Sequence, residues 1–422
     1  MRGPTPVSPR VVFLNRYFFP DHSATSQILS DLAFHLAERG ENVRVIASRQ
    51  LYDDAAAALP PRECVLGVEI HRVGTTRFGR HALLGRAIDY LSFYVASALR
   101  LLRVARRGDV VVAKTDPPML SVLISALARI RGYRTINWLH DLYPEVAAEL
   151  GISSVKGPVG RILISLRNAS LRRATMNVAI GDDMAKRVRG MGVAAARLSV
   201  VTNWTDDESI RPSDAATNPL RRAWSLEGKF VVAYSGNLGR AHDSQTLLEA
   251  AEILRGDPDV VFLFIGGGRG LIDLAAEVEK RHLKNFRFEP YQPREALSRS
   301  LGAADVHWLS LKPGLDGLIL PSKFYGVAAA GRAILIIGSP DGELAELVAK
   351  HGCGYCITPG QGAELAGIIA ALSQDRSRCR QLGANARRML DERLTKSQAL
   401  ERWRTILHSA AGGASPMEAH RE

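Results

Sequence analysis

Residues 229–243 read KFVVAYSGNLGRAHD, and their pattern of apolar residues and glycines indicates the type of fold. Its apolar run lacks the polar alternation of a half-solvated strand, which indicates a strand buried on both faces. Gly236 and Gly239 end the run, and a helical pattern starts near Ser244. A buried strand, a glycine loop and a helix in this order are typical of a parallel sheet covered by helices.

The same alternation extends along the chain on both sides of this stretch. Residues 205–222, TDDESIRPSDAATNPLRR, are polar, contain two prolines and read as a linker between two sets of strands. The expected strands cover 11–17, 43–48, 110–115, 135–140, 176–181 and 198–203 in the first set, and 229–237, 260–268, 285–290, 306–311, 333–338 and 354–357 in the second.

We therefore predict an α/β protein with two doubly wound, Rossmann-like domains, over residues 11–205 and 223–397. A helix over 398–409 is expected to pack back on the first domain. In this architecture the carboxyl-edge loops of the two sheets face each other across a cleft, where a ligand binds.

Composition limits the class of protein. The 422 residues exceed what one hydrophobic core usually serves, and the four cysteines are too few for a disulfide scaffold, which fits a reducing compartment. No apolar run reaches the roughly 20 residues that span a bilayer, and residues 1–10 lack the apolar segment of a secretory signal. We expect a cytoplasmic protein.

The formal charge of +12 is unevenly distributed, with thirteen Lys and Arg against five Asp and Glu between residues 61 and 134. Here an apolar series at helical spacing is flanked by arginines, which suggests either a helix on an acidic membrane surface or a core-facing helix with a basic rim. Nucleic acid is not expected, because zinc-finger spacing, an RNP-like strand and a basic arm are all missing. The series is Leu84, Ile88, Leu91, Val95, Ala98 and Leu102, with Arg80, Arg86, Arg100, Arg103, Arg106 and Arg107 beside it.

Two glycine-rich loops follow strands of the second set. In the first, Gly236 allows close backbone approach, and Arg240 and His242 add donors beside a helix start, a favourable place for phosphate. The second, FIGGGRG, contains Gly267 and Gly268 after the next strand. Neither is a complete GxGxxG, and tight turns alone would explain either loop.

A long cation interrupts a third stretch, GLDGLILPSKFYGVAAAG, over residues 314–331. Burying an unpaired ammonium is expensive, so Lys323 should lie beside an anion, or else extend from a helix start into solvent. The first alternative is favoured.

These motifs together resemble the family 4 glycosyltransferases of the GT-B fold, in the subgroup that builds exopolysaccharide, O-antigen and colanic-acid-type repeat units. The likeness extends from Val11 to Trp403, and it rests on YFFPDHSATSQILSDLAFHLAERG, HDLYPE, AIGDDMAKRV, VTNWTD, YSGNLGRAHD, IGGG and DGLILPSKFYG. The resemblance implies that the second domain holds a nucleotide-diphosphate sugar, that the first holds the acceptor, and that transfer retains the anomeric configuration.

The resemblance also implies roles for individual residues. Arg240 and Lys323 would neutralise the leaving diphosphate, while His140 and Asp141 would lie beside the reacting sugar. Where the family has two glutamates, this chain has Asp316 and Gly326. The remaining donor-binding positions would be Gly236, Asn237, His242, Gly267, Gly268, Pro321, Ser322 and Glu343, and those for the acceptor Asp21 and His22.

We thus expect a UDP- or GDP-sugar as co-substrate and no cofactor or metal. The only D-x-D, at residues 257–259, reads as a turn between helix and strand. The expected acceptor is a polyprenyl-diphosphate-linked glycan at the anionic inner face of the plasma membrane. Two other classes stay open: a non-catalytic nucleotide-sugar-binding scaffold, and a dinucleotide-dependent oxidoreductase or epimerase.

Overall fold

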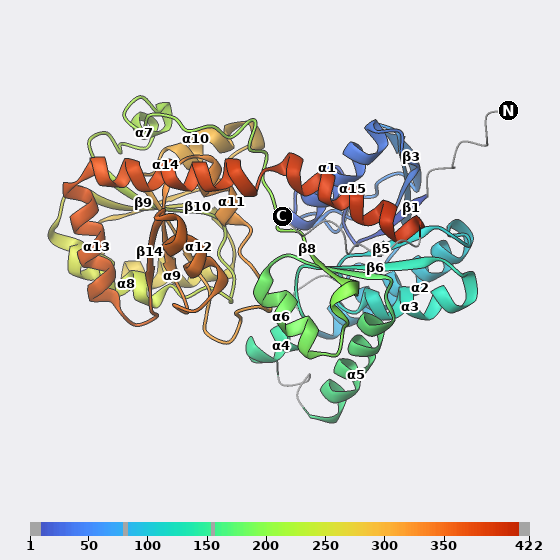
Figure 1. Ribbon diagram of the computed structural model, residues 1–422. Helices are drawn as coiled ribbons and strands as arrows, with labels where there is room; N and C mark the ends of the chain where they lie inside the picture. Colours follow the sequence, from blue (N-terminus) through green and yellow to red (C-terminus); the bar gives the residue numbers. More distant parts are fainter. Residues whose placement is uncertain (1–9, 79–82, 153–156, 413–422) are drawn as a thin grey trace. The chain divides into compact units, whose positions relative to one another are not determined.

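The computed structural model describes residues 10–78, 83–152 and 157–412, and it divides the chain into two compact units (Figure 1). The first unit comprises residues 1–202 together with 399–422, and the second comprises residues 203–398. The sequence-based boundaries were 11–205, 223–397 and 398–409. The C-terminal segment is thus part of the first unit.

The first unit contains an eight-stranded sheet in the order β3-β4-β2-β1-β5-β6-β7-β8. All neighbours are parallel except β3 and β4, which form an antiparallel hairpin. The strands are β1 (Val11–Leu14), β2 (Val43–Ser48), β3 (Arg62–Val65), β4 (Val68–Val73), β5 (Val110–Ala113), β6 (Arg134–Leu139), β7 (Met176–Ala179) and β8 (Leu198–Val200).

Helices connect and cover these strands. They are α1 (Ala24–Glu38), α2 (Leu83–Val104), α3 (Leu120–Arg131), α4 (Glu145–Glu149), α5 (Pro158–Arg173), α6 (Asp182–Gly190) and α15 (Lys396–Gly412). The last of these, α15, docks on the first unit through apolar and polar contacts. Its Trp403 is fully buried against Trp138 of β6, and the Arg134 guanidinium donates to the Ala410 carbonyl oxygen at 2.7 Å.

The second unit is a six-stranded, fully parallel sheet in the doubly wound order β11-β10-β9-β12-β13-β14. Its strands are β9 (Phe230–Asn237), β10 (Val260–Gly267), β11 (Phe286–Glu289), β12 (Val306–Ser310), β13 (Ala333–Ile337) and β14 (Gly354–Ile357). Its helices are α7 (Pro219–Ala223), α8 (Gln245–Ile253), α9 (Arg269–Lys280), α10 (Leu297–Gly302), α11 (Lys323–Ala329), α12 (Glu343–His351), α13 (Gly362–Gln374) and α14 (Arg376–Arg393).

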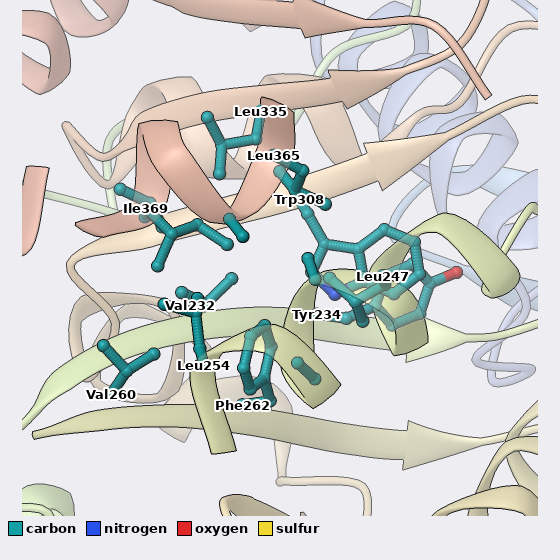
Figure 2. Close-up of a cluster of buried hydrophobic side chains, with 14 of the residues drawn as sticks. Val232, Tyr234, Leu247, Leu254, Val260, Phe262, Trp308, Leu335, Leu365 and Ile369 are labelled. Atoms are coloured by element: carbon teal, nitrogen blue, oxygen red, sulfur yellow. The ribbon is translucent and has the colours of Figure 1, made fainter. Parts of the chain in front are cut away.

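The apolar strand residues form the core of this unit. Figure 2 shows Val232 and Tyr234 of β9 in one apolar cluster with Phe262 of β10, Trp308 of β12 and Leu247 of α8. The Tyr234 and Trp308 rings lie 4.9 Å apart. On the opposite face of β9, Val231 and Ala233 are buried in a second cluster with Leu263 and Ile265 of β10. The strand is thus buried on both faces, as KFVVAYSGN predicted, and the predicted fold class is confirmed.

Two features of the first unit differ from the sequence prediction. The β3–β4 hairpin was not predicted, although Leu66 and Gly67 form a two-residue turn with φ of 46° and 81°, the left-handed values that such hairpins require. The hairpin lies in the basic region, whose strands are short and interrupted by charges.

The second difference concerns α2. Of the six apolar residues expected on one face, Leu84, Ile88, Leu91 and Val95 are exposed, with Leu84 at 80%. The buried face carries a different series, which is Asp89, Phe93, Ser97, Leu101 and Val104. The alternative in which the first series faces the core is therefore wrong. Arg80, placed beside this helix, lies outside the described residues.

Candidate functional site

The sheet order of the second unit creates a topological switch point between β9 and β12. From β9 the chain proceeds to β10 and β11 on one side, and from β12 to β13 and β14 on the other. The loops that leave β9 and β12 therefore diverge at the carboxyl edge, the usual ligand position in such sheets. They contact each other through the backbone, because Lys312 donates to the Ala241 carbonyl oxygen at 2.9 Å.

Lys323, the first residue of α11, lies at this switch point. Its Nζ donates to the carbonyl oxygen of Asn237 at 3.2 Å and lies 5.1 Å from the centre of the Tyr234 ring. Its Cε comes within 2.6 Å of the position that a β-carbon on Gly236 would occupy. Burial lowers the pKa of Lys323 to about 8. The ammonium is thus held at the glycine loop and is largely charged at neutral pH.

His242 lies beside Lys323 in the loop after β9. Its Nδ1 is 2.6 Å from the Ser310 carbonyl oxygen at the end of β12. Burial lowers the pKa of His242 to about 4, and the nearby charge of Lys323 acts in the same direction. The imidazole is therefore neutral at pH 7. With Nδ1 protonated towards Ser310, its Nε2 is left as an acceptor.

The second glycine loop lies directly beside the first. In the parallel pairing of β9 with β10, Gly236 is opposite Gly266 and Asn237 is opposite Gly267. A β-carbon on Gly268, the residue before α9, would lie 2.7 Å from the backbone carbonyl oxygen of Leu238, and φ at Gly268 is 109°. Only glycine fits this close approach of two backbones. The two loops thus share one edge of the sheet, as their sequence positions predicted.

Three further donor-site candidates lie in the loop after β9 or just before α11. Arg240 is exposed in the loop after β9. Pro321 and Ser322 immediately precede α11, where their carbonyl oxygens accept from the backbone of its first turn. These positions put Pro321 and Ser322 next to Lys323 in the chain, whereas the Arg240 side chain extends into solvent.

Asp316 and Glu343 lie around the start of α12. The Asp316 Oδ1 is 2.9 Å from where a β-carbon on Gly342 would be, and Glu343 is the first residue of the helix. Carboxylates at this end complement the helix dipole. Gly326 lies within α11, where an added β-carbon would meet only ordinary van der Waals contacts.

In the first unit, His140 and Asp141 follow β6 directly. His140 is 7% exposed, and within the described chain no group hydrogen bonds to its Nε2. Burial and the nearby Lys114 hold the pKa of His140 well below its usual range. Burial also raises the pKa of Asp141 to about 6, with Asp116 adding to the effect and Lys114 opposing it.

Asp21 and His22 follow β1 but differ in environment. Asp21 is buried, and its carboxylate accepts from the backbone amides of Ser23 and Tyr52, so it fastens two loops of the first unit. His22 is exposed, and its carbonyl oxygen accepts from the Gln27 side chain at 2.6 Å. Of the two, only the His22 side chain is presented to solvent.

The sequence reasoning missed Lys114 and Asp116, which follow β5. The first unit also has a switch point, between β1 and β5. Here the backbone amide of Arg16 donates to the Asp116 carbonyl oxygen at 2.8 Å. The run VVVAKTD carries the signal, since it places a cation and an acid at the carboxyl end of a buried strand. A small pocket, partly open to solvent, lies here, and its lining includes Lys114, Thr115, Asn137, Asp141, Tyr143 and Arg167.

Among the described residues, no group of three or more His, Cys, Asp or Glu could hold a metal ion. No described helix combines the length and apolarity needed to cross a membrane.

Two family models match most of the chain. The glycosyl transferase 4-like domain covers residues 24–204, and the glycosyl transferases group 1 domain covers residues 218–389. Among curated relatives, the probable glycosyltransferase WbjE of Pseudomonas aeruginosa is 26% identical over 78% of this chain and 81% of its own length. The putative colanic acid biosynthesis glycosyl transferase WcaI of Escherichia coli K12 is 27% identical over 84% and 90%.

Solved structures with the same fold include two glycosyltransferases of low sequence identity. Anabaena HepE, determined with UDP, aligns with a TM-score of 0.69 at 16% identity over 95% of this chain and all of its own. WaaG, a glycosyltransferase involved in lipopolysaccharide biosynthesis, aligns with a TM-score of 0.65 at 17% identity over 94% and 99%. At these identities the likeness concerns the fold.

Proposed function

Because the chain belongs to the family 4 glycosyltransferases of the GT-B fold, we propose that it is a retaining hexosyltransferase that uses a UDP- or GDP-sugar. The second unit binds the donor and the first binds the acceptor, a polyprenyl-diphosphate-linked glycan of exopolysaccharide or O-antigen biosynthesis. HepE has been solved with UDP-glucose, and WcaI is named for colanic acid biosynthesis, which supports both parts of the proposal.

The observation that carries the donor assignment is Lys323 at the switch point of the second unit. Its ammonium lies against Gly236, and the neutral ring of His242 lies beside it. The positive charge of Lys323 is therefore placed at the glycine loop, whose backbone a ligand can approach closely. A diphosphate satisfies such a cation and gains stabilisation as negative charge develops on the leaving group. Arg240, exposed on the same loop, is free to close on the diphosphate.

Calorimetric titration of UDP and GDP tests this assignment. Lys323→Met should weaken binding of the preferred nucleotide roughly ten- to hundredfold, the value of one charge-assisted hydrogen bond, and Arg240→Ala should weaken it less. Lys284→Met is the matched control, because Lys284 is an exposed cation just before β11, at the amino edge of the same sheet. Equal affinity in all four proteins would refute the donor site.

For the acceptor side, we infer that the first unit docks on anionic lipid through α2, α3 and α5. The exposed apolar residues of α2 are Leu84, Ile88, Leu91, Val95 and Leu99, and those of α3 and α5 are Ile130, Val159, Ile162 and Leu166. The three helices contain one acidic residue, Asp89, which is buried, and several exposed arginines. An apolar surface whose exposed charges are all basic suits a membrane of acidic lipids.

Vesicle flotation tests the membrane part separately from the chemistry. The intact protein should float with phosphatidylglycerol vesicles at low salt and much less with phosphatidylcholine vesicles. Salt screens the attraction between the arginines and anionic lipid, and phosphatidylcholine carries no net charge to attract them. Absence of binding to anionic vesicles at low salt would count against the membrane and leave the donor assignment untouched. The anomeric configuration of the product, read by proton NMR, tests retention.

A further inference from the structure

The Lys114 side chain is buried at the switch point of the first unit, where none of the proposed steps uses it. It is 2% exposed, and its Nζ donates to the Thr25 carbonyl oxygen at 2.9 Å. A buried cation costs free energy unless partners compensate, so its retention needs an explanation.

The strand register explains which groups surround this cation. Ala113, the last residue of β5, pairs with Asn137 of β6, so Lys114 comes opposite Trp138. The ammonium lies 4.0 Å from the centre of a Trp138 ring, a cation–π contact. Residues two apart on a strand share a face, and the His140 ring accordingly lies 5.1 Å from Trp138.

The C-terminal helix completes this arrangement. The Trp403 ring of α15 packs 4.4 Å from Trp138, and both indoles are almost fully buried. Trp138 is thus held between the C-terminal helix on one side and the candidate catalytic residues on the other. Lys114 and Asp141 line the same pocket. Burial lowers the pKa of Lys114 well below its usual range, and the carboxylates of Asp116 and Asp141 oppose this shift by favouring the charged form.

We propose that Lys114 is a positioning residue of the first-unit site, which balances the charge of Asp116 and Asp141 and fixes His140 through the shared contact with Trp138. This inference rests on the proposed function. Without the cation, the charges of the half-buried Asp116 and Asp141 would be left unbalanced, and each carboxylate would resist ionisation of the other. The Lys114 charge also opposes protonation of His140. Loss of the Lys114 charge therefore favours the protonated forms of the two carboxylates and of His140.

Lys114→Met tests the proposal, with Lys114→Gln as a second variant that keeps a donor for Thr25 without the charge. We expect a melting temperature equal to or above that of the native chain, unchanged UDP affinity, and at least a tenfold lower kcat for transfer or donor hydrolysis. The acid limb of the pH–rate profile should move to higher pH by about one unit in both variants. Lys186→Met, at an exposed position of α6, is the matched control.

A Lys114→Met variant with the native kcat and the native acid limb of the pH–rate profile would overturn the proposal. Lys114 would then have only a structural role in the core. Recovery of the native profile by Lys114→Gln would also overturn it, because the hydrogen bond rather than the charge would then matter. Failure of the native chain to bind UDP or GDP, or to release sugar from any donor, would instead sink the proposed function. The two failures are therefore distinguishable.

Discussion

The Cε of Lys323 lies 2.6 Å from the position that a β-carbon on Gly236 would take. These residues are far apart in sequence, yet the glycine gives the lysine side chain the space in which it reaches the carboxyl edge of β9. The φ of 122° at Gly236 belongs to a region that residues with a side chain rarely adopt. The cation and the glycine loop thus depend on each other.

Gly236→Ala should disturb both the fold and the donor site. We expect a loss of roughly 1–3 kcal/mol in the free energy of unfolding from the strained backbone, and weaker UDP binding because the methyl group displaces the lysine. Denaturant unfolding and calorimetry measure the two effects. Gly367→Ala, at an open and exposed position of α13, is the control and should stabilise the protein by up to about 1 kcal/mol.

The affinity for UDP should fall as the pH rises above about 8, because Lys323 there loses the proton that makes it a cation. The lowered pKa also means that the buried charge of Lys323 reduces the stability of the folded protein below pH 8. This destabilisation decreases as the pH rises from 8 towards the pKa of a lysine in the unfolded chain. Lys323→Met should therefore melt no lower than the native chain at pH 7 and should lose the alkaline decrease in affinity. An identical decrease in the variant would assign it to another group.

Acid should destabilise the second unit partly through His307. Burial lowers the pKa of His307 to about 4, and its Nε2 bonds to the Leu301 carbonyl oxygen at 2.9 Å. In the unfolded chain the pKa of a histidine is higher, about 6.5. The neutral His307 therefore contributes its full stabilisation above pH 6.5. This contribution is lost as the pH falls to 4, by at most about 1.4 kcal/mol per pH unit. His307→Gln should give a flatter acid slope in urea titrations. A slope as steep as the native one would contradict this.

Polar substitution on the exposed face of α2 should weaken membrane binding without weakening the fold. Leu91→Gln with Val95→Gln changes two side chains that are 62% and 55% exposed, so the melting temperature should change little, while the bound fraction in flotation should fall severalfold. Ile272→Gln, on an exposed apolar residue of α9, is the control and should float as the native chain does.

Removal of metal ions should leave transfer unchanged. In the proposed donor site, Lys323 and Arg240 would supply the positive charge that a divalent cation would otherwise bring to the diphosphate. Rates measured in excess EDTA should match those in magnesium. A loss of activity that added magnesium or manganese restores would show that these side chains are insufficient.

Local sequence patterns predicted most of the strands and the sheet edge at which we propose that the donor binds. Long apolar runs such as KFVVAYSGN are compatible only with burial on both faces, so the periodicity predicted two parallel α/β sheets, and the glycines after β9 and β10 predicted the loops that lie side by side. The β3–β4 hairpin was missed because its strands are short and charged. The orientation of α2 stayed open between two alternatives because both of its faces carry apolar residues.

Which side chains share an environment became clear only from the way the strands and helices pack. Lys323 reaches Gly236 across 87 positions of sequence, and Trp403 reaches Trp138 from the last described helix, because strand order and helix docking bring those positions together. Lys114 carried no motif, and its neighbourhood appeared only once β5 and β6 were paired in register. Local patterns specify which elements form; the charge and burial that set a side chain's chemistry come from residues distant in the chain.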